Sequence, residues 1–523
     1  MNEIQLEFYT AFNLVRIRHN GNSSDEFYGK EIRFFYRQMP VFDNISNRYY
    51  QALLDSRFQT ELKQKLGKRL FEIAKVYTAE GNPKTEPIDQ EINKLAGNYN
   101  RVIAQGAFSF EGKKHPLGAV GKFTQSENAQ TRKTALDAFY GFWELKAEEL
   151  HESFDKLVKL RVRKAQILGF ENFIEESYKE YGYNSQEVSD YNKAVLKYFV
   201  PLKKRLYERR LKRMGVKEVH YYDASQYKNG NPKLQVKGED LWSNTQKMYA
   251  ELSPETNDFC RFMLANELLD TEPRKGKAQT AYMTFLGKYK QPFIFANFHG
   301  THHDFNILTH EMGHAFQYFQ TKKEGILQME YEMPTRDVSE THAISMELFT
   351  WDWYSLFFKE DTARFQFSKI SGMLDTIVSS CLDEDFQQFI YKNSQITPTQ
   401  RNQKWLELKK TYYPYNPDSL YEGSNYLKEG HNWLMNAHTF CRPFYSVAYS
   451  LATLCAVQFW MKAQKDKKGA WEDYLRLCKA GGKYSFFESL QLANLRSPFD
   501  ENVIQEIAQF LGDWLENVDD SGF

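Results

Sequence analysis

The sequence predicts a predominantly α-helical protein, and three observations support that fold class. Apolar residues recur at helical spacing over long stretches of the chain. Runs that are typical of β-strands are short and confined to a few places. No internal repeat, low-complexity tract or obvious linker divides the 523 residues, of which only 15 are Pro and 28 are Gly. We therefore expect one intertwined, mostly helical body.

Three long helices follow from the apolar spacing. Apolar residues recur every four positions from Leu54 to Leu70, which predicts one stripe of an amphipathic helix. A second helix is expected from Ser126, a favourable N-cap, to Gly169. A third is expected from near Ser185 toward Met214, with Pro201 as a kink or break.

The strand signals are three short segments rich in aromatic and β-branched residues. They lie around Arg101–Phe110, at Val219–Tyr222 and within Ala281–Phe298. The most apolar stretch, Pro443–Trp460, is interrupted by polar residues and flanked by charged ones. These interruptions favour a buried helix over a membrane span.

The charge balance bears on possible partners. The chain carries 68 Lys and Arg against 68 Asp and Glu, so its formal net charge is zero. Binding to nucleic acid or to an anionic membrane surface normally requires an excess of basic residues. The basic run Lys203–Arg213 is interpreted as a solvated helix face. We expect neither nucleic acid nor membrane as a partner.

The five cysteines and the first residues bear on the compartment. Five is an odd number, and no CxxC pair occurs, which argues against a disulfide framework and against a thiolate metal site. The start, MNEIQLEFYT, lacks the basic flank and apolar run of a secretory signal. These features predict a reducing, cytoplasmic location.

The strongest chemical signal is the HEMGH motif, His310–His314. Four residues on an α-helix correspond to about 400°, so the two histidines project from one face, one turn apart. Both imidazoles can therefore bind one metal ion, and Glu311 lies where it can accept a proton from metal-bound water. The motif favours a zinc site over a pair of structural histidines.

A third ligand is expected from the downstream helix, because catalytic zinc normally has three protein ligands and one water. Asp337, Glu340, Ile344 and Glu347 share one face of this helix at spacings of three, four and three, and such an acidic face is costly to bury without a cation. Glu340 is the candidate ligand, while Asp337 and Glu347 are expected to orient the imidazoles. His342, about 200° around the helix from Glu340, is a competing ligand.

Several segments together carry a family resemblance. They are Lys277–Thr301, Leu308–Gln317, Met333–Trp353, Asp383–Tyr391, His438–Trp460 and Ser485–Phe499. In order and spacing they resemble the oligoendopeptidase F branch of the thimet oligopeptidase family of zinc metallopeptidases. The resemblance extends over roughly residues 126 to 515.

This resemblance implies an elongated, two-lobed helical fold with a deep central channel and a small β-sheet near the zinc site. It implies a catalytic domain of residues 126–523 and an N-terminal helical segment with short strands, residues 1–125, packed on it. One Zn²⁺ per chain would be held by His310, His314 and Glu340.

The resemblance also implies further site residues. His438, Tyr445 and Tyr449 would be catalytic residues that face the cleaved bond, and the spacing of the two tyrosines puts them on one helical face. Tyr282 and Thr284 lie in a segment that resembles the edge strand on which a peptide binds by β-augmentation.

The expected function is a zinc-dependent endopeptidase that hydrolyses internal bonds of short, unstructured peptides, with a metal-activated water and Glu311 as general base. Two alternatives remain: a zinc carboxypeptidase, which needs a cationic pocket for a free C-terminus, and a non-catalytic peptide-binding scaffold. A purely structural zinc would normally have four protein ligands, and the sequence offers three. The oligomeric state stays open.

Overall fold

The computed structural model describes residues 1–80, 82, 84–124, 126–179, 181–223, 227, 230–326 and 328–523. Helices dominate these residues, as the sequence predicts. The helices before residue 270 are α1 (Asn2–Gly21), α2 (Glu26–Leu54), α3 (Gln59–Leu66), α4 (Lys68–Glu80), α5 (Glu86–Gln105), α6 (Val120–Thr124), α7 (Ala129–Ile167), α8 (Phe173–Tyr178), α9 (Ser185–Met214), α10 (Glu239–Leu252) and α11 (Pro254–Ala265).

The later helices carry most of the predicted site. They are α12 (His302–Lys323), α13 (Arg336–Phe349), α14 (Tyr354–Phe358), α15 (Thr362–Lys392), α16 (Pro398–Tyr412), α17 (Asn425–Lys428), α18 (Ala437–Cys441), α19 (Ser446–Ala463), α20 (Lys467–Ala480), α21 (Phe486–Leu492) and α22 (Glu501–Glu516). No described helix is long and apolar enough to cross a membrane.

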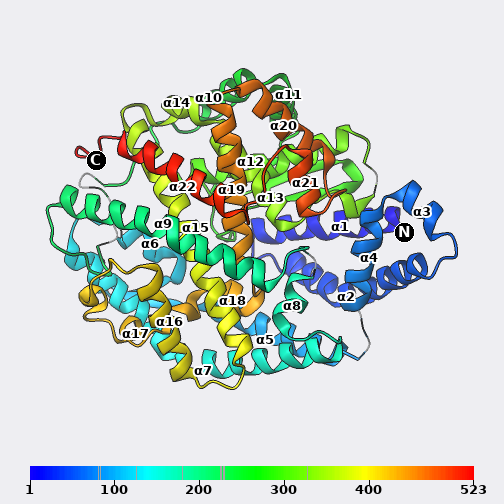
Figure 1. Cartoon of the computed structure of the whole chain (residues 1–523), viewed down its shortest axis with the longest axis horizontal. Helices are drawn as coiled ribbons and strands as arrows, with labels where there is room; N and C mark the ends of the chain where they lie inside the picture. Colours follow the sequence, from blue (N-terminus) through cyan, green and yellow to red (C-terminus); the bar gives the residue numbers. More distant parts are fainter. Residues whose placement is uncertain are drawn as a thin grey trace.

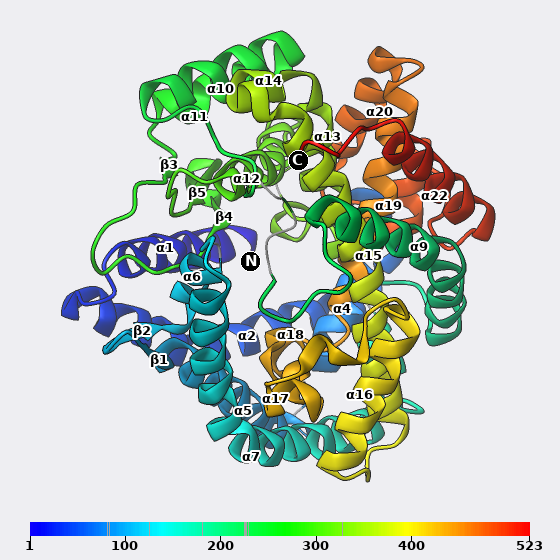
Figure 2. The same cartoon turned by 90° about the vertical axis from the view of Figure 1, so that its left-hand side faces the viewer.

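The helices form two groups, which Figures 1 and 2 both show. One group contains α10, α11, α14 and α20, and the other contains α5, α7, α16 and α17. The long helices α15 and α19 run between the two groups and pack against each other. This arrangement agrees with the predicted two-lobed helical fold.

Two small sheets complete the fold. Strands β1 (Ala107–Phe110) and β2 (Lys113–Pro116) form an antiparallel hairpin. The second sheet has the order β3 (Leu269–Asp270), β5 (Gln291–Phe295), β4 (Tyr282–Leu286), so β4 is an edge strand. Helix α12 packs on β4 and β5, and α1 packs on β4, as Figure 2 shows.

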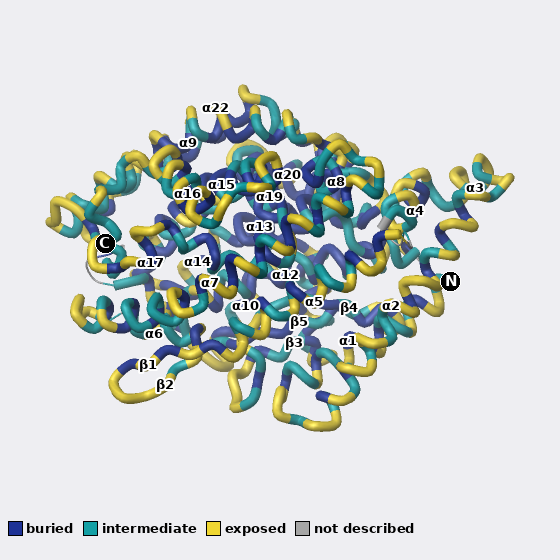
Figure 3. The backbone as a smooth tube through the Cα atoms, turned by 90° about the horizontal axis from the view of Figure 1, so that it is seen from below, coloured by how far each residue is buried: buried dark blue, intermediate teal, exposed yellow. Residues whose placement is uncertain are grey.

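Helix α13 lies at the centre of the molecule, between α12 and α19. Every residue from Asp337 to Phe349 is buried, which Figure 3 shows as dark blue. A helix that is buried on all sides is usually apolar all round, yet this one carries Asp337, Glu340 and Glu347. Carboxylates in such a position require hydrogen bonds or cations to offset their desolvation.

Two of the three predicted long helices are confirmed. The structure begins α7 at Ala129 rather than Ser126, because the side chain of Asn128 accepts hydrogen bonds from two main-chain N–H groups of the first turn. The helix ends just before Gly169, which has a positive φ. Helix α9 matches its predicted bounds, and Pro201 lies inside it without breaking it.

The predicted helix from Leu54 to Leu70 is wrong. Helix α2 ends at Leu54, and Gly67, with φ of +93°, separates α3 from α4. The apolar spacing of four continues across these breaks because residues from different helices meet in one small cluster, which includes Leu53, Leu70 and Phe71.

The strand predictions succeed only in part. The segment Ala281–Phe298 contains β4 and β5, and most of Pro443–Trp460 lies in the buried helix α19, which continues to Ala463. Of Arg101–Phe110, only the last four residues form a strand, because α5 extends to Gln105. Val219–Tyr222 forms no strand, since its main chain enters a turn in which Asp223 N–H donates to the carbonyl of His220.

Gly313, within the HEMGH motif, permits the close contact of α12 and α13. A Cβ atom at this position would lie 2.7 Å from Ala343 Cα and 3.0 Å from the carbonyl oxygen of His342. We expect Gly313→Ala to lower the free energy of unfolding by about 1–3 kcal/mol through overpacking, measured by urea unfolding.

A matched control is Gly372→Ala, in the interior of α15, where an added Cβ would meet nothing within 4 Å. This control should raise stability by roughly 0.5–1 kcal/mol, because Ala is favoured over Gly inside a helix. Equal effects of the two substitutions would contradict the close-contact interpretation.

Candidate metal centre

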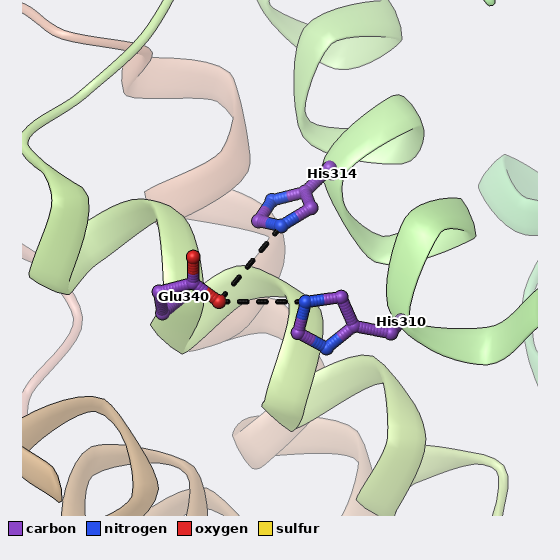
Figure 4. Close-up of side chains that lie close together, drawn as sticks. All are labelled: His310, His314 and Glu340. Atoms are coloured by element: carbon purple, nitrogen blue, oxygen red, sulfur yellow. Dashed lines mark ion pairs between the residues drawn. The ribbon is translucent and has the colours of Figure 1, made fainter. Parts of the chain in front are cut away.

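His310 and His314 on α12 face Glu340 on α13, as Figure 4 shows. Glu340 Oε2 lies 3.4 Å from His310 Nε2 and 4.0 Å from His314 Nε2. One donor atom from each of the three residues lies within 4.8 Å of the other two, and no other such group of three occurs among the described residues. The structure therefore brings the three predicted ligands together.

This donor set fits a zinc ion. Ligand atoms at zinc distances of 2.0–2.2 Å in tetrahedral geometry are about 3.4 Å apart, close to the observed separations. Glu340 Oε2 is buried and accepts no hydrogen bond from the described residues. Two imidazoles and a carboxylate are also donors that zinc prefers.

The charges within the cluster are strongly coupled. Burial raises the pKa of Glu340, but the adjacent imidazoles of His310 and His314 outweigh that effect and hold the pKa below its usual value. Burial lowers the pKa of His314 to about 4. His314 is therefore neutral near pH 7, the form that binds metal.

The side of His310 opposite Glu340 is held by Glu347. Glu347 Oε1 lies 2.8 Å from His310 Nδ1, and its other oxygen forms an ion pair with Lys369 of α15. Lys369 also donates to Asn306 Oδ1 at 3.3 Å. A carboxylate on the second ring nitrogen fixes the orientation of a metal-binding imidazole.

The ring of His314 has a different partner. Its Nδ1 lies 3.3 Å from the hydroxyl oxygen of Ser339. Asp337, the other residue expected to orient an imidazole, accepts hydrogen bonds from the Thr335 hydroxyl and the Val338 N–H, at the first turn of α13. His342 is fully buried beside Tyr474 and lies outside the group of three donors.

Glu311 lies between the cluster and the edge strand. Its side chain is 8% exposed, and its carboxylate accepts a hydrogen bond from the main-chain N–H of Met283 in β4. Burial raises its pKa, an effect that His310 opposes and Glu340 supports. A carboxylate with a raised pKa is a stronger base.

His438, Tyr445 and Tyr449 form one aromatic cluster beside Glu340. The rings of His438 and Tyr445 are stacked with centroids 4.6 Å apart, and those of Tyr445 and Tyr449 are 5.2 Å apart. The Tyr445 hydroxyl donates to Glu340 Oε1 at 3.4 Å. Asn436 caps α18 by accepting from the His438 N–H, which fixes the position of the histidine.

The two predicted substrate-binding residues, Tyr282 and Thr284, lie in β4, and neither has a fully exposed side chain. Thr284 is buried, and the hydroxyl of Tyr282 accepts from Asn20 Nδ2 at 3.0 Å. In an antiparallel strand, alternate residues direct both main-chain groups away from the partner strand. Met283, which donates to Glu311, and Phe285, whose carbonyl accepts from Asn13 Nδ2 at 2.9 Å, are the outward-facing residues here.

Sequence reasoning missed three residues around the centre. Lys369 and Ser339 contact the groups described above, and Arg336 places its guanidinium 4.9 Å from the centre of the Tyr445 ring. Arg336 directly precedes the acidic face of α13, so its position next to the site could have been recognised from the sequence. Lys369 lies on a distant helix, and no spacing connects it to the motif.

The segment Gly423–Gly430 has a glycine at each end and precedes His438 in the sequence. It contains the short helix α17, in which Tyr426 and Leu427 are buried. The Tyr426 ring stacks on those of Tyr140 and His431. The middle of the segment is thus anchored in the core.

The chain is similar to known peptidases over most of its length. Residues 122–509 match peptidase family M3, and residues 1–79 match the peptidase M3 N-terminal domain. The chain superposes on the solved structure of PZ peptidase A with inhibitor 2 with a TM-score of 0.92 and 38% identity, over 99% of this chain and 92% of that one.

The similarity extends to sequence relatives with lower identity. Oligopeptidase PepF of Bacillus subtilis (strain 168) is 23% identical over 384 residues, which are 71% of this chain and 55% of that protein. An oligoendopeptidase F homolog of Borreliella burgdorferi is 22% identical over 79% of this chain and 72% of its own length. The match with PepF thus spans little more than half of that protein.

Proposed function

Since the chain belongs to peptidase family M3, we propose that it is a zinc-dependent endopeptidase that hydrolyses internal bonds of short, unstructured peptides. The observation that carries this proposal is the convergence of His310, His314 and Glu340 beside the buried carboxylate of Glu311. We also propose that residues 126–523 form the catalytic domain, with residues 1–125 packed on it, and that the enzyme works in the cytoplasm.

In this proposal His310, His314 and Glu340 hold one zinc ion per chain, which supplies Lewis acidity toward water and the peptide carbonyl when it is bound. Glu347 and Ser339 orient the two imidazoles through their Nδ1 atoms. The ion pair with Lys369 in turn holds Glu347 in place.

Glu311 is the proposed general base. Its carboxylate accepts the proton of the attacking water and later delivers that proton to the leaving amine. Burial, which raises its pKa, strengthens it as a base, and the hydrogen bond from Met283 holds it next to the strand that would carry the peptide.

Tyr445, Tyr449 and His438 are proposed to stabilise the oxyanion that develops on the peptide carbonyl. Burial raises the pKa of both tyrosines, so their hydroxyls keep their protons near pH 7 and can donate hydrogen bonds. Burial and the nearby charges of Arg442 and Arg336 lower the pKa of His438, which therefore acts as a neutral donor.

The edge strand β4 is the proposed binding surface for the peptide main chain. An extended peptide can pair with the Met283 carbonyl and the Phe285 N–H, the outward-facing groups that the contacts with Glu311 and Asn13 leave free. Tyr282 and Thr284, predicted as substrate-binding residues, lie between and beside these positions. Pairing of this kind requires an extended segment, which a folded protein does not present.

A digest of defined peptides tests this function. Mass spectrometry should find internal cleavage of unstructured peptides, with rates that differ by less than about twofold between free and amidated C-termini, and no cleavage of a folded protein of similar sequence. Removal of single C-terminal residues, blocked by amidation, would instead support the carboxypeptidase alternative. Binding without any product would support a scaffold.

A further inference from the structure

A cavity of about 480 Å³ lies between the N-terminal helices and the edge strand, outside the metal centre. Its wall includes Gln5 and Tyr9 of α1, Asp43 and Tyr50 of α2, Phe285 of β4, and Glu330. Neither the metal ligands nor the proposed catalytic residues line it. Its role is therefore separate from bond cleavage itself.

The cavity offers hydrogen-bond acceptors that carry negative charge, and its described lining residues supply no positive charge. Asp43 and Glu330 both line it, and none of its described lining residues is Lys, Arg or His. Asp43 is an exposed residue whose partial desolvation raises its pKa, and Glu330 is partly buried. A carboxylate in such a position is stabilised when a cation binds beside it.

Gln5 supplies an independent sign of a ligand. The residue is 5% exposed, and its carbonyl oxygen has no hydrogen-bond partner among the described residues. The Tyr50 hydroxyl donates its proton to Glu330 at 2.8 Å, so its oxygen accepts from the Gln5 amide nitrogen at 3.3 Å. That arrangement fixes the amide and leaves its enclosed carbonyl oxygen without a donor among the described residues.

The edge strand connects this cavity to the metal centre. Met283 contacts Glu311, and Phe285, two residues further, lines the cavity. Two residues of an antiparallel strand span about 7 Å. Asn13 occupies the outward-facing carbonyl of Phe285, so a paired peptide must leave the strand at this point. The cavity is adjacent to the place where it would leave.

We propose that this cavity binds a cationic group of the peptide, two or three residues from the cleaved bond. The group is either the N-terminal ammonium or a Lys or Arg side chain, since both donate charge-assisted hydrogen bonds to carboxylates such as those of Asp43 and Glu330. The inference rests on the proposed function. Where the group is the N-terminal ammonium, the cavity also sets the direction of binding, because Asp43 and Glu330 would repel a C-terminal carboxylate.

Matched peptides test the proposal without any substitution. A series places the N-terminus one to five residues before the cleaved bond, each peptide with a free or an acetylated amine. We expect a free amine to raise kcat/KM about tenfold at one length, two or three residues, and to have little effect at the others. In longer, acetylated peptides, Gln at that position is replaced by Lys or Arg. A rise in kcat/KM for these peptides would show that a side chain, and not only the N-terminal ammonium, binds in the cavity.

The variant Asp43→Asn should remove this preference, lowering kcat/KM for the charged peptides about tenfold and leaving the neutral ones unchanged. Glu26→Gln, an exposed site on the same helix, is the matched control for a loss of charge and should change neither. Equal losses for charged and neutral peptides, or no preference in the unsubstituted protein, would overturn the proposal.

Binding measurements separate this inference from the proposed function. Fluorescence anisotropy with Glu311→Gln, which should bind peptides without cleaving them, compares the affinities of the free and acetylated peptides. If the unsubstituted protein cleaves none of the peptides, the proposed function fails, and the affinity difference still tests the cavity. If cleavage occurs with equal affinities for both forms, only the cavity proposal fails.

Discussion

Replacing Glu311 with Gln is expected to lower kcat for an internally quenched peptide by about 10²–10⁴-fold while one zinc per chain stays bound. The amide has nearly the same shape as the carboxylate but cannot accept the proton of the attacking water. The three ligand side chains remain, so metal content should not change. Elemental analysis by mass spectrometry and the peptide assay measure the two quantities on the same sample.

The matched control is Glu324→Gln at the C-terminal end of the same helix, where the side chain is exposed and pairs with Lys479. This variant should keep both its metal and its activity. Cleavage retained within tenfold by the Glu311→Gln variant would exclude the carboxylate as general base.

Removal of the Glu340 carboxylate is expected to have the largest effect on metal binding. Glu340→Ala leaves two imidazoles, too few for the three-ligand site of a catalytic zinc, so dialysed protein should retain little zinc and cleave no peptide at a detectable rate. Zinc content after dialysis is the primary measurement, since it does not depend on activity.

Glu347→Gln provides a graded comparison. The amide can still contact His310 Nδ1 but carries no charge, so zinc affinity should fall by about 10- to 100-fold rather than vanish. Urea unfolding of both variants establishes that each is folded. Full zinc occupancy in Glu340→Ala, or equal affinity losses in the two variants, would contradict the assigned roles.

The parts of the site that follow from helical periodicity could be predicted from the sequence. His310 and His314 share a face because they are one turn apart, and the acidic face of α13 is recognisable by the same rule. Their convergence depends on the packing of α12 against α13. Gly313 permits this packing because it has no side chain where Ala343 and His342 of α13 lie. The sequence pattern identifies the faces, and the packing sets the distances.

Features that depend on contacts between distant segments could not be predicted in this way. Lys369 reaches Glu347 from α15, and no local pattern connects those helices. The apolar spacing from Leu54 to Leu70 reflects a shared cluster of separate helices and so imitates one continuous helix. Likewise, the pairing of β4 with β5 decides which main-chain groups of β4 face outward, and the side chain of Asn13 occupies one of them, the carbonyl of Phe285.

Helix α1 has a consequence for the synthesis of the chain. Asn13 donates to Phe285 across 272 positions, and Asn20 donates to Tyr282 across 262. At translation rates of about 5–20 residues per second, the ribosome reaches the edge strand roughly 14–54 s after it makes the helix that docks on it. During that interval α1 must exist without this partner, so the strand edge and the cavity can form only after more than half of the chain has been made.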